Sequence, residues 1–199
     1  MSSTNRGGKR APSDNYPTPF WCVARLLEVV APEGAVWMDP CAGTGSIIQA
    51  VKMLRPEIVW HSCEIRPECL EPLQNIDARP VIGDFLVPGM RFAGIHTIIM
   101  NPPYRLAQQF IEKSLQVAPH VFVLLRLNYL GSSKRNTFMR NHCPDIYVLP
   151  NRPAFRQDGQ TDSIEYGWFE FRRLSKQMPV KTEGRFRVLP LTPKEERRF

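Results

Sequence analysis

The chain has 199 residues and a hydrophobic content of 43%, which is typical of one globular domain with a full core. No apolar run approaches the roughly 20 residues that a membrane-spanning helix needs. The polar N-terminus has no apolar signal core, so we expect neither a membrane partner nor export. The five cysteines lack CxxC spacing and Cys/His pairing, which argues against a disulfide framework or a zinc site and for a reducing compartment.

The net charge of +7 is concentrated at the two ends of the chain. Residues 1–15 hold three basic and one acidic side chain, and residues 172–199 hold nine basic and three acidic ones. The body between them, residues 16–171, is nearly neutral with 14 basic and 15 acidic side chains. Basic ends attract polyanions, although solubilising arms would have the same composition. We therefore expect a disordered basic tail (1–15), one folded domain (16–171) and a basic C-terminal extension (172–199).

Helices and strands are predicted to alternate along the folded domain. Apolar patterns predict helices over residues 20–30, 44–55, 68–74 and 106–117, with a basic helix or loop over 133–142. Strands are predicted over residues 35–38, 58–64, 80–82, 95–100, 120–127, 146–149 and 164–171. This order is typical of a mostly parallel sheet with helices on both faces, and the loop between the last two strands predicts an antiparallel pair. Beyond residue 171 no core pattern is visible.

A glycine-containing loop, Asp39-Pro40-Cys41-Ala42-Gly43-Thr44-Gly45-Ser46, separates the first predicted strand from its helix. The glycines permit a tight turn and let the backbone approach a ligand closely. The spacing is GxG and no Gly-Lys-Ser/Thr follows, so neither a dinucleotide pyrophosphate site nor a P-loop is indicated. An acid at the start of the loop would repel phosphate and favours a cationic ligand.

Two further acids follow the ends of the next predicted strands. Glu64 lies 25 residues after Asp39, where a carboxylate can accept both ribose hydroxyls. Asp84 can accept from an adenine amino group while Phe85 packs on the ring. Any one of these acids could be a surface turn residue. Three of them in order beside one glycine loop specify a nucleoside with a positive centre, and S-adenosylmethionine fits this description.

The tetrapeptide Asn101-Pro102-Pro103-Tyr104 directly follows the predicted strand over residues 95–100. Proline cannot donate to a strand ladder, so the strand ends abruptly at the carboxyl edge of the sheet, where ligands bind in open α/β folds. The turn presents an amide side chain, fixed carbonyls and an aromatic ring. These groups suit a flat ring with an exocyclic amino group, although the tetrapeptide alone could be an ordinary turn before a helix.

Together these motifs resemble those of amino-group DNA methyltransferases, most closely the small phage-type adenine-N6 enzymes. The resemblance covers residues 16–171, starts with Tyr16-Pro17-Thr18-Pro19, and includes residues 149–162 and Tyr166-Gly167-Trp168-Phe169. It implies an α/β, Rossmann-like class I methyltransferase fold, with a mostly parallel seven-stranded sheet, helices on both faces and an antiparallel last strand. It also implies a cytoplasmic location, in a bacterium or a phage-infected cell. No separate target-recognition domain is visible, so loops, a tail or a second subunit would set sequence specificity.

The resemblance implies S-adenosylmethionine as the cofactor and adenine-containing DNA as the substrate. The Asn101 side-chain oxygen and the Pro102 carbonyl would accept the N6 hydrogens of a flipped adenine, and Tyr104 would stack on the base. The implied catalytic residues are Asn101, Pro102, Pro103 and Tyr104. The implied cofactor-binding residues are Tyr16, Thr18, Pro19, Asp39, Pro40, Ala42, Gly43, Gly45, Glu64, Ile65, Asp84, Phe85 and Asn101.

Seven further residues are candidates for contact with the substrate, and no metal site is predicted. They are Arg126, Asn128, Tyr129, Lys134, Arg135, Arg152 and Phe155. A strand-end loop or a solvated helix face would explain most of them as well. RNA adenine methylation and protein glutamine methylation remain alternatives, because both use the same tetrapeptide. A non-catalytic nucleic-acid-binding module on this fold is a third, which the intact tetrapeptide and glycine loop disfavour.

Overall fold

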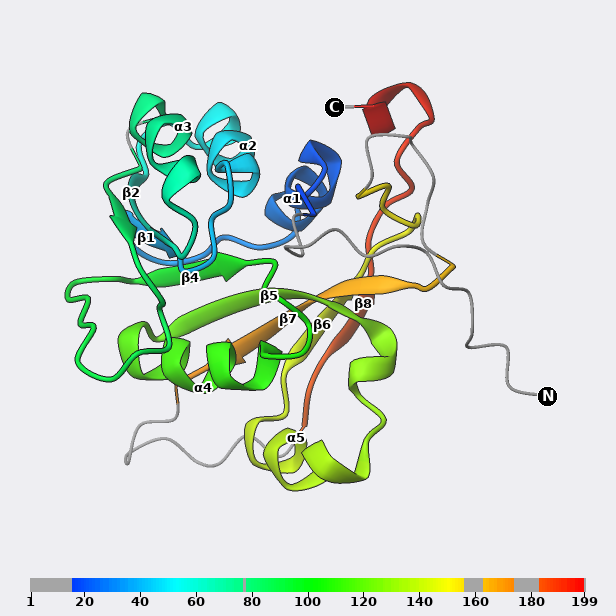
Figure 1. Cartoon of the computed structure of the whole chain (residues 1–199). Helices are drawn as coiled ribbons and strands as arrows, with labels where there is room; N and C mark the ends of the chain where they lie inside the picture. The colour runs from blue at the N-terminus through cyan, green and yellow to red at the C-terminus, as the bar shows by residue number, and fades with distance from the viewer. Residues whose placement is uncertain (1–15, 77, 156–162, 174–182, 199) are drawn as a thin grey trace.

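A computed structural model describes residues 16–76, 78–155, 163–173 and 183–198 of the chain. In these residues one sheet of eight strands has the order β3-β2-β1-β4-β5-β7-β6-β8 (Figure 1). Five strands run parallel to one another: β1 (Val36–Asp39), β2 (Val59–Glu64), β3 (Pro80–Ile82), β4 (Thr97–Met100) and β5 (His120–Arg126). The others are β6 (Asp145–Val148), β7 (Tyr166–Arg172) and β8 (Phe186–Val188). Strand β7 is antiparallel to both β5 and β6, as predicted for the closing pair.

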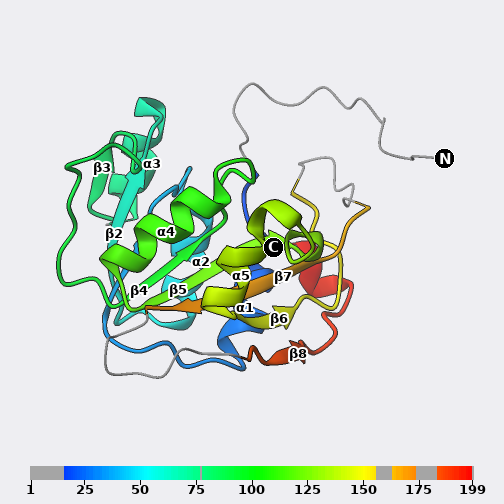
Figure 2. The ribbon, with the colours of Figure 1, turned by 90° about the horizontal axis from the view of Figure 1, so that it is seen from below.

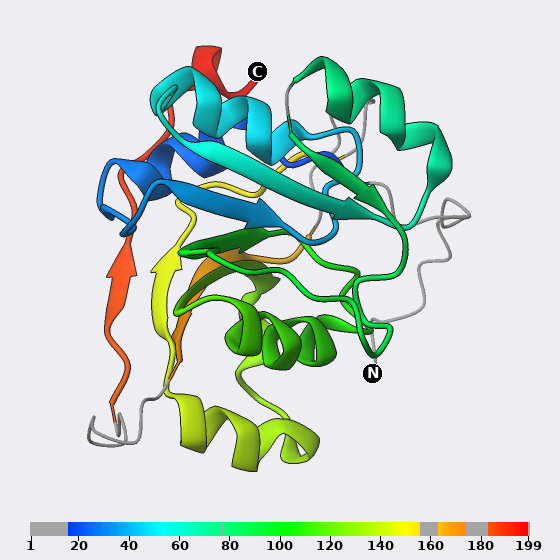
Figure 3. The same cartoon turned by 90° about the vertical axis from the view of Figure 1, so that its left-hand side faces the viewer.

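Helices cover both faces of the sheet. The first face carries α1 (Phe20–Leu27), α2 (Ser46–Leu54) and α3 (Leu70–Asn75), which lie above the sheet in Figure 3. The opposite face carries α4 (Ala107–Val117) and α5 (Asn136–His142), which face the viewer in Figure 2. Two buried apolar clusters fill these interfaces, and all four residues of β4 are buried between them. A strand covered on both faces reads as a continuous apolar run, which is why β4 was predictable.

Four short 3-10 segments complete the described elements: η1 (Pro67–Cys69), η2 (Leu127–Tyr129), η3 (Ser133–Arg135) and η4 (Glu195–Arg198). The predicted basic helix or loop over residues 133–142 is η3 followed by α5. No helix in the described ranges is both long enough and apolar enough to cross a membrane.

The strand order places a topological switch point between β1 and β4. The chain leaves β1 towards β2 and β3 on one side and then returns to β4 on the other, where Trp37 pairs with Thr97. The connections on the two sides of this point therefore diverge, and they leave a crevice beyond the carboxyl ends of the strands. Asp39 ends β1 and Asn101 follows β4, so both lie at the rim of this crevice.

The predicted strand number was wrong, because the sheet has eight strands and not seven. The eighth, β8, pairs parallel with β6 and comes from the basic extension, where no core pattern is visible. It has three residues, all of them exposed, so backbone pairing forms it and not burial of an apolar face. Beyond it, the buried Leu189 and Thr192 attach the extension to the domain. The predicted tail, residues 1–15, lies outside the described residues.

Candidate active site at the strand ends

The glycine loop makes a tight turn between β1 and α2. Gly43 and Gly45 both have positive φ, of 55° and 87°. A Cβ added to Gly45 would lie 2.3 Å from the Ile76 Cδ1 atom, so Ile76 would have to move, and the left-handed backbone conformation itself favours glycine there. The Ala42 and Gly43 N–H groups donate to the Cys63 carbonyl and to the Glu64 carboxylate, at 3.1 and 2.7 Å. The loop is thus fastened to the end of β2.

Asp39 lies buried at the start of this loop, with 2% of its surface exposed. Its Oδ1 atom accepts a hydrogen bond of 3.1 Å from the Cys41 N–H. The pKa of Asp39 is raised to about 7, mainly by burial; the hydrogen bond from the Cys41 N–H opposes this rise, and the nearby Glu64 carboxylate adds to it. A neighbouring cation would favour the ionised carboxylate. A positively charged ligand would therefore bind favourably to this buried carboxylate, as we expect from the sequence.

Glu64, at the end of β2, is 4% exposed and uses both carboxylate oxygens within the protein. Oε2 accepts from the Gly43 N–H, and Oε1 accepts from the Arg66 N–H at 3.1 Å and from the Arg66 Nε at 2.9 Å. The predicted contact with ribose hydroxyls stays a prediction. For this contact to form, a ribose hydroxyl would have to share Oε1 with the Arg66 guanidinium or displace the guanidinium from it.

Asp84 and Phe85 follow β3 as predicted. The Asp84 Oδ1 atom accepts from the Leu86 N–H at 2.8 Å, and the side chain stays half-buried. The Phe85 ring is 1% exposed and stacks on Phe110 with ring centroids 5.6 Å apart. The Phe85 ring therefore belongs to the core and reaches the crevice only with its edge of exposed surface. Ile65, by contrast, is 63% exposed and offers a larger apolar surface to a flat ligand.

Two neighbouring cavities follow this rim. The strand-end cavity, of about 230 Å³, is lined by Glu64, Ile65, Asp84, Phe85, Pro103, Leu106 and Phe110, among others. The loop cavity, of about 40 Å³, is lined by Tyr16, Thr18, Asp39, Ala42, Gly43 and Ser46, among others. Cys41, Arg66 and Asn101 border both. Leu106 and Phe110 were missed from the sequence. Leu106 directly precedes α4 and is 40% exposed, and Phe110 is a buried residue of α4, so neither position carries a functional signal in the sequence.

Asn101 leaves the end of β4 towards the N-terminal lead-in, residues 16–19. Its Nδ2 atom donates to the Tyr16 carbonyl and to the Thr18 hydroxyl, each at 3.2 Å. A carbonyl oxygen can only accept, so the nitrogen and not the oxygen of the amide must face Tyr16. The Oδ1 atom therefore points away from the lead-in. Sequence reasoning placed the lead-in near the cofactor but did not predict its contact with Asn101.

A third and much smaller cavity, of about 10 Å³, lies beside Asn101 and is lined by Tyr16, Asn101, Pro102, Pro103 and Tyr104. We call it the acceptor cavity. The Arg126 guanidinium lies 5.0 Å from the centre of the Tyr104 ring. Tyr166 packs directly against Tyr104, with ring centroids 6.1 Å apart, and Arg126 donates to the Tyr166 hydroxyl at 3.0 Å.

Phe155 packs edge-on against both Tyr16 and Tyr166, with ring centroids 6.1 and 5.1 Å apart. Tyr16 and Tyr104 line the acceptor cavity, and Phe155, Tyr166 and Arg126 pack against these two rings. We call these five residues the aromatic wall. Two of the predicted substrate residues, Arg126 and Phe155, therefore belong to this wall. Sequence reasoning missed Tyr166 in this role, because its position in an apolar strand predicts a core residue.

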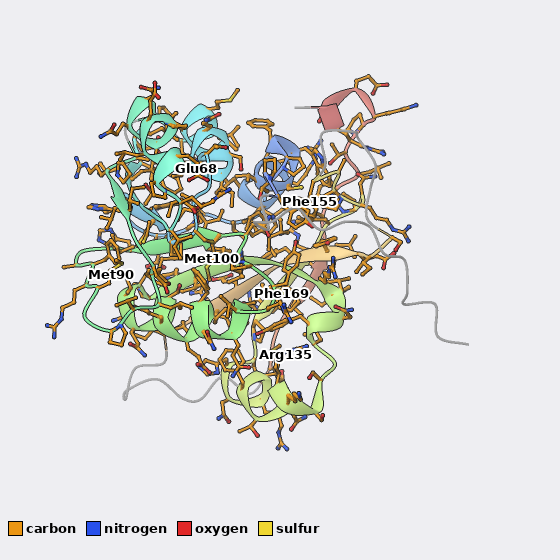
Figure 4. The ribbon with its side chains drawn as sticks, viewed as in Figure 1. Glu68, Met90, Met100, Arg135, Phe155 and Phe169 are labelled. Atoms are coloured by element: carbon orange, nitrogen blue, oxygen red, sulfur yellow. The ribbon has the colours of Figure 1, made fainter. Side chains whose placement is uncertain are left out.

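The other predicted substrate residues lie elsewhere. Arg152 forms a surface ion pair with Glu165, at 2.6 Å, and Asn128 and Lys134 are exposed. Figure 4 shows Arg135 beside α5, far from Phe155, which lies close to α1. The predicted contact of Tyr129 with the substrate stays a prediction. Its ring is 8% exposed, packs against Phe169, and is covered by the Arg135 guanidinium at 4.2 Å, so it would have to turn outwards to meet a base.

Three predicted cofactor residues, Pro19, Pro40 and Gly45, lie outside the linings described for the loop and strand-end cavities. They shape the turns instead. A larger cavity, of about 870 Å³, is a groove between α1, α2 and the C-terminal segment. Its lining is mainly apolar and contains none of the strand-end acids and not Asn101. We therefore assign the chemistry to the smaller cavities, where the polar groups converge.

No protein-family model matches the sequence, and no curated protein matches it. Solved structures do share its fold. A Listeria monocytogenes protein assigned to the class I S-adenosylmethionine-dependent methyltransferases is 15% identical with a TM-score of 0.62, over 91% of this chain and 68% of that one. The type I restriction enzyme EcoKI M protein is 14% identical with a TM-score of 0.63, over 94% of this chain and 51% of that one. The 23S rRNA methyltransferase ErmE is 14% identical with a TM-score of 0.53, over 80% and 69%. These comparisons establish a Rossmann-like class I methyltransferase fold.

Proposed function

We propose that this protein transfers a methyl group from S-adenosylmethionine to the N6 amino group of adenine in DNA. The observation that carries the proposal is the position of Asn101. This residue borders the loop cavity, the strand-end cavity and the acceptor cavity, and its amide nitrogen is fastened on the side away from the free oxygen. A methyl donor in the first two cavities and a planar amine in the third would meet at this side chain.

The side chains of the strand ends fit S-adenosylmethionine. Asp39 would hold the ammonium group of the methionine portion, and Glu64 the ribose hydroxyls. Asp84 would accept from the adenine amino group, while Ile65 and Leu106, both partly exposed, would contact the ring. When bound, the cofactor supplies a methyl group activated by a positively charged sulfur. Three carboxylates and the absence of a P-loop lysine suit this cationic nucleoside and not a nucleotide phosphate.

Asn101 and Pro102 would act on the acceptor. The lone pair of an adenine amino group is delocalised into the ring, which makes the nitrogen a poor nucleophile. Hydrogen bonds from its two N–H groups to the Asn101 Oδ1 and the Pro102 carbonyl would favour a tetrahedral nitrogen and stabilise the positive charge that develops there. A preorganised contact of this kind contributes about 3 kcal/mol. The amino nitrogen then loses one proton to solvent, so no histidine base is needed.

The acceptor side has to open before a base can enter. The acceptor cavity, of about 10 Å³, has room for about one water molecule and is far too small for a purine ring. The target base must also leave the duplex, at a cost of a few kcal/mol. We therefore expect the aromatic wall to rearrange when the nucleic acid binds. The ring of Tyr104 would stack on the base, and Arg126 would support the opposite face of that ring.

The test is to incubate the protein with labelled S-adenosylmethionine and, separately, double-stranded DNA, single-stranded DNA, RNA and a glutamine-containing protein. We expect label in DNA, recovered as N6-methyladenine after digestion to nucleosides. Mapping the modified adenines in DNA from an expressing cell would then give the recognition sequence. Label in RNA or protein alone would replace DNA as the substrate class, and no label with any acceptor would refute the proposal.

A further inference from the structure

The lead-in to α1 holds the side chain that the proposed reaction depends on most. Thr18 and Asn101 are 83 residues apart in the sequence, yet the Thr18 hydroxyl accepts a hydrogen bond from the Asn101 Nδ2 atom at 3.2 Å. The Tyr16 carbonyl accepts the second one, also at 3.2 Å. Both N–H groups of the amide therefore have acceptors on one short segment of chain.

The Tyr16 carbonyl, which can only accept, sets the orientation of the amide, and the Thr18 hydroxyl adds a second hydrogen bond that holds it there. If the amide turned by 180°, Oδ1 would face the Tyr16 carbonyl, and two acceptors would oppose each other. The turned amide would also present N–H groups towards the acceptor cavity. A donor facing the N–H groups of an exocyclic amine can make no hydrogen bond with them. An unfastened Asn101 would thus spend part of its time in an unproductive orientation.

Thr18 is itself held in place. It is 4% exposed, and prolines on both sides, Pro17 and Pro19, fix φ in the neighbouring residues. Its N–H donates to the Ser46 hydroxyl at 3.1 Å. Ser46 is the first residue of α2, directly after Gly45. A continuous set of contacts therefore runs from the glycine loop through Ser46 and Thr18 to the Asn101 amide.

We propose that Thr18 is a positioning residue for the methyl transfer. Its hydroxyl fastens the Asn101 amide so that Oδ1 meets the amino group of the acceptor. This inference rests on the function proposed above. It differs from a role for Thr18 in holding the cofactor. A cofactor contact predicts a change in the affinity for S-adenosylmethionine, whereas positioning of Asn101 predicts a change in kcat with that affinity preserved.

Two variants separate these roles. Thr18→Val keeps the shape of the side chain and removes the acceptor, and Thr18→Ser keeps the hydroxyl. We expect Thr18→Val to lower kcat by about five- to tenfold, the effect of losing one neutral hydrogen bond. The Kd for S-adenosylmethionine should stay within about twofold, and Thr18→Ser should retain most of the wild-type kcat. Thr137→Val, which removes an exposed hydroxyl on α5, is the matched control.

A second measurement does not need enzyme activity. The side-chain NH2 signals of Asn101 can be assigned in a proton–nitrogen correlation spectrum by their loss in Asn101→Ala. We expect slow exchange of these hydrogens with solvent in the wild type. In Thr18→Val one of the two signals should shift and exchange faster, and in Thr18→Ser neither should change.

The outcomes distinguish this inference from the proposed function. If Thr18→Val has wild-type kcat and unchanged amide signals, or if Thr18→Ser is equally impaired, the positioning role is refuted while the function stands. If the wild type methylates no adenine but the amide signals respond as expected, the function fails. The positioning of Asn101 is then supported for a different acceptor amine.

Discussion

The two sides of Asn101 are built differently. The donor side, formed by the loop and strand-end cavities, has a volume of about 230 Å³ in its larger part and about 40 Å³ in its smaller part, whereas the acceptor cavity has only about 10 Å³. The donor side is lined by groups at the ends of successive strands, with fixed backbone and buried carboxylates. The acceptor side is closed by rings from segments far apart in the chain. The comparison suggests a preformed site for the donor and an adjustable one for the acceptor.

The strongest way to break this comparison is to remove the side chain where the two sides meet. Asn101→Ala should lower kcat by about 10²- to 10³-fold, because it deletes a preorganised acceptor that acts mainly in the transition state. Binding of S-adenosylmethionine, measured by calorimetry, should survive, since the donor side keeps its carboxylates. Asn136→Ala, at an exposed position on α5, is the control. Near-normal turnover of Asn101→Ala would remove the mechanism.

The rigidity of the donor side can be tested at Gly45. Here φ is +87° and an added Cβ would approach Ile76 Cδ1 to 2.3 Å. We expect Gly45→Ala to destabilise the fold by about 1–3 kcal/mol and to weaken S-adenosylmethionine binding. Thermal unfolding with and without the cofactor measures both effects.

Two other glycines separate the causes of that loss. Gly89 has a φ of +92° with nothing within 4 Å of an added Cβ, and Gly131 has open space without a positive φ. Gly89→Ala should therefore show only the backbone cost, and Gly131→Ala almost none. If Gly45→Ala proves as stable as Gly131→Ala, the loop is less constrained than its geometry implies.

The sequence predicted the donor side better than the acceptor side. The donor side depends on local signals: a glycine loop, prolines that end β4, and acids directly after apolar strands. All three signals could be recognised in the sequence alone. The acceptor side depends on packing between distant segments, such as Phe155 against Tyr16, whose rings meet only in the folded chain. The contact between Thr18 and Asn101 spans 83 residues and has no local signature.

Tyr129 and strand β8 show the same limit. Tyr129 follows the end of β5, where residues often reach a ligand, but its ring turns inwards and packs against Phe169. Which way a side chain turns after a strand depends on the available space, and the sequence does not encode this locally. Strand β8 was missed because its residues are exposed on both faces and pairing with β6 alone defines it.

The charge of the donor side gives a pH-dependent prediction. Because the pKa of Asp39 is raised to about 7, its carboxyl is mostly protonated below that pH. Binding of a cationic ammonium needs the ionised form. The affinity for S-adenosylmethionine should therefore fall by up to about tenfold per pH unit below pH 7 and level off above it. Calorimetric titrations with S-adenosylmethionine at pH values between about 5.5 and 7.5 would measure this fall in affinity.

Asp39→Asn is the matched variant. It should weaken cofactor binding but raise the stability of the fold at neutral pH. A carboxyl with a raised folded-state pKa binds more protons in the folded than in the unfolded state, so the wild type loses stability as pH rises from the unfolded value of 3.8 towards 7. The variant should lack that loss, melt at a higher temperature above pH 7, and bind the cofactor weakly with a flat pH profile. A wild-type profile that is equally flat would contradict the role of Asp39.

The smallest expected effect concerns Arg66, the one feature that makes the donor side less than fully preformed. Its Nε–H donates to the Glu64 Oε1 at 2.9 Å, where a ribose hydroxyl would bind, and the residue borders both donor-side cavities. Arg66→Gln removes this ion pair but leaves Glu64 its hydrogen bonds from the backbone N–H groups of residues 43 and 66. Since a partly exposed ion pair contributes at most about 1 kcal/mol, we expect a two- to fivefold gain in cofactor affinity, relative to Arg91→Gln at an exposed position with the same change in charge. A loss of affinity would instead mean that Arg66 contacts the cofactor directly, and that the donor side closes around its ligand as the acceptor side does.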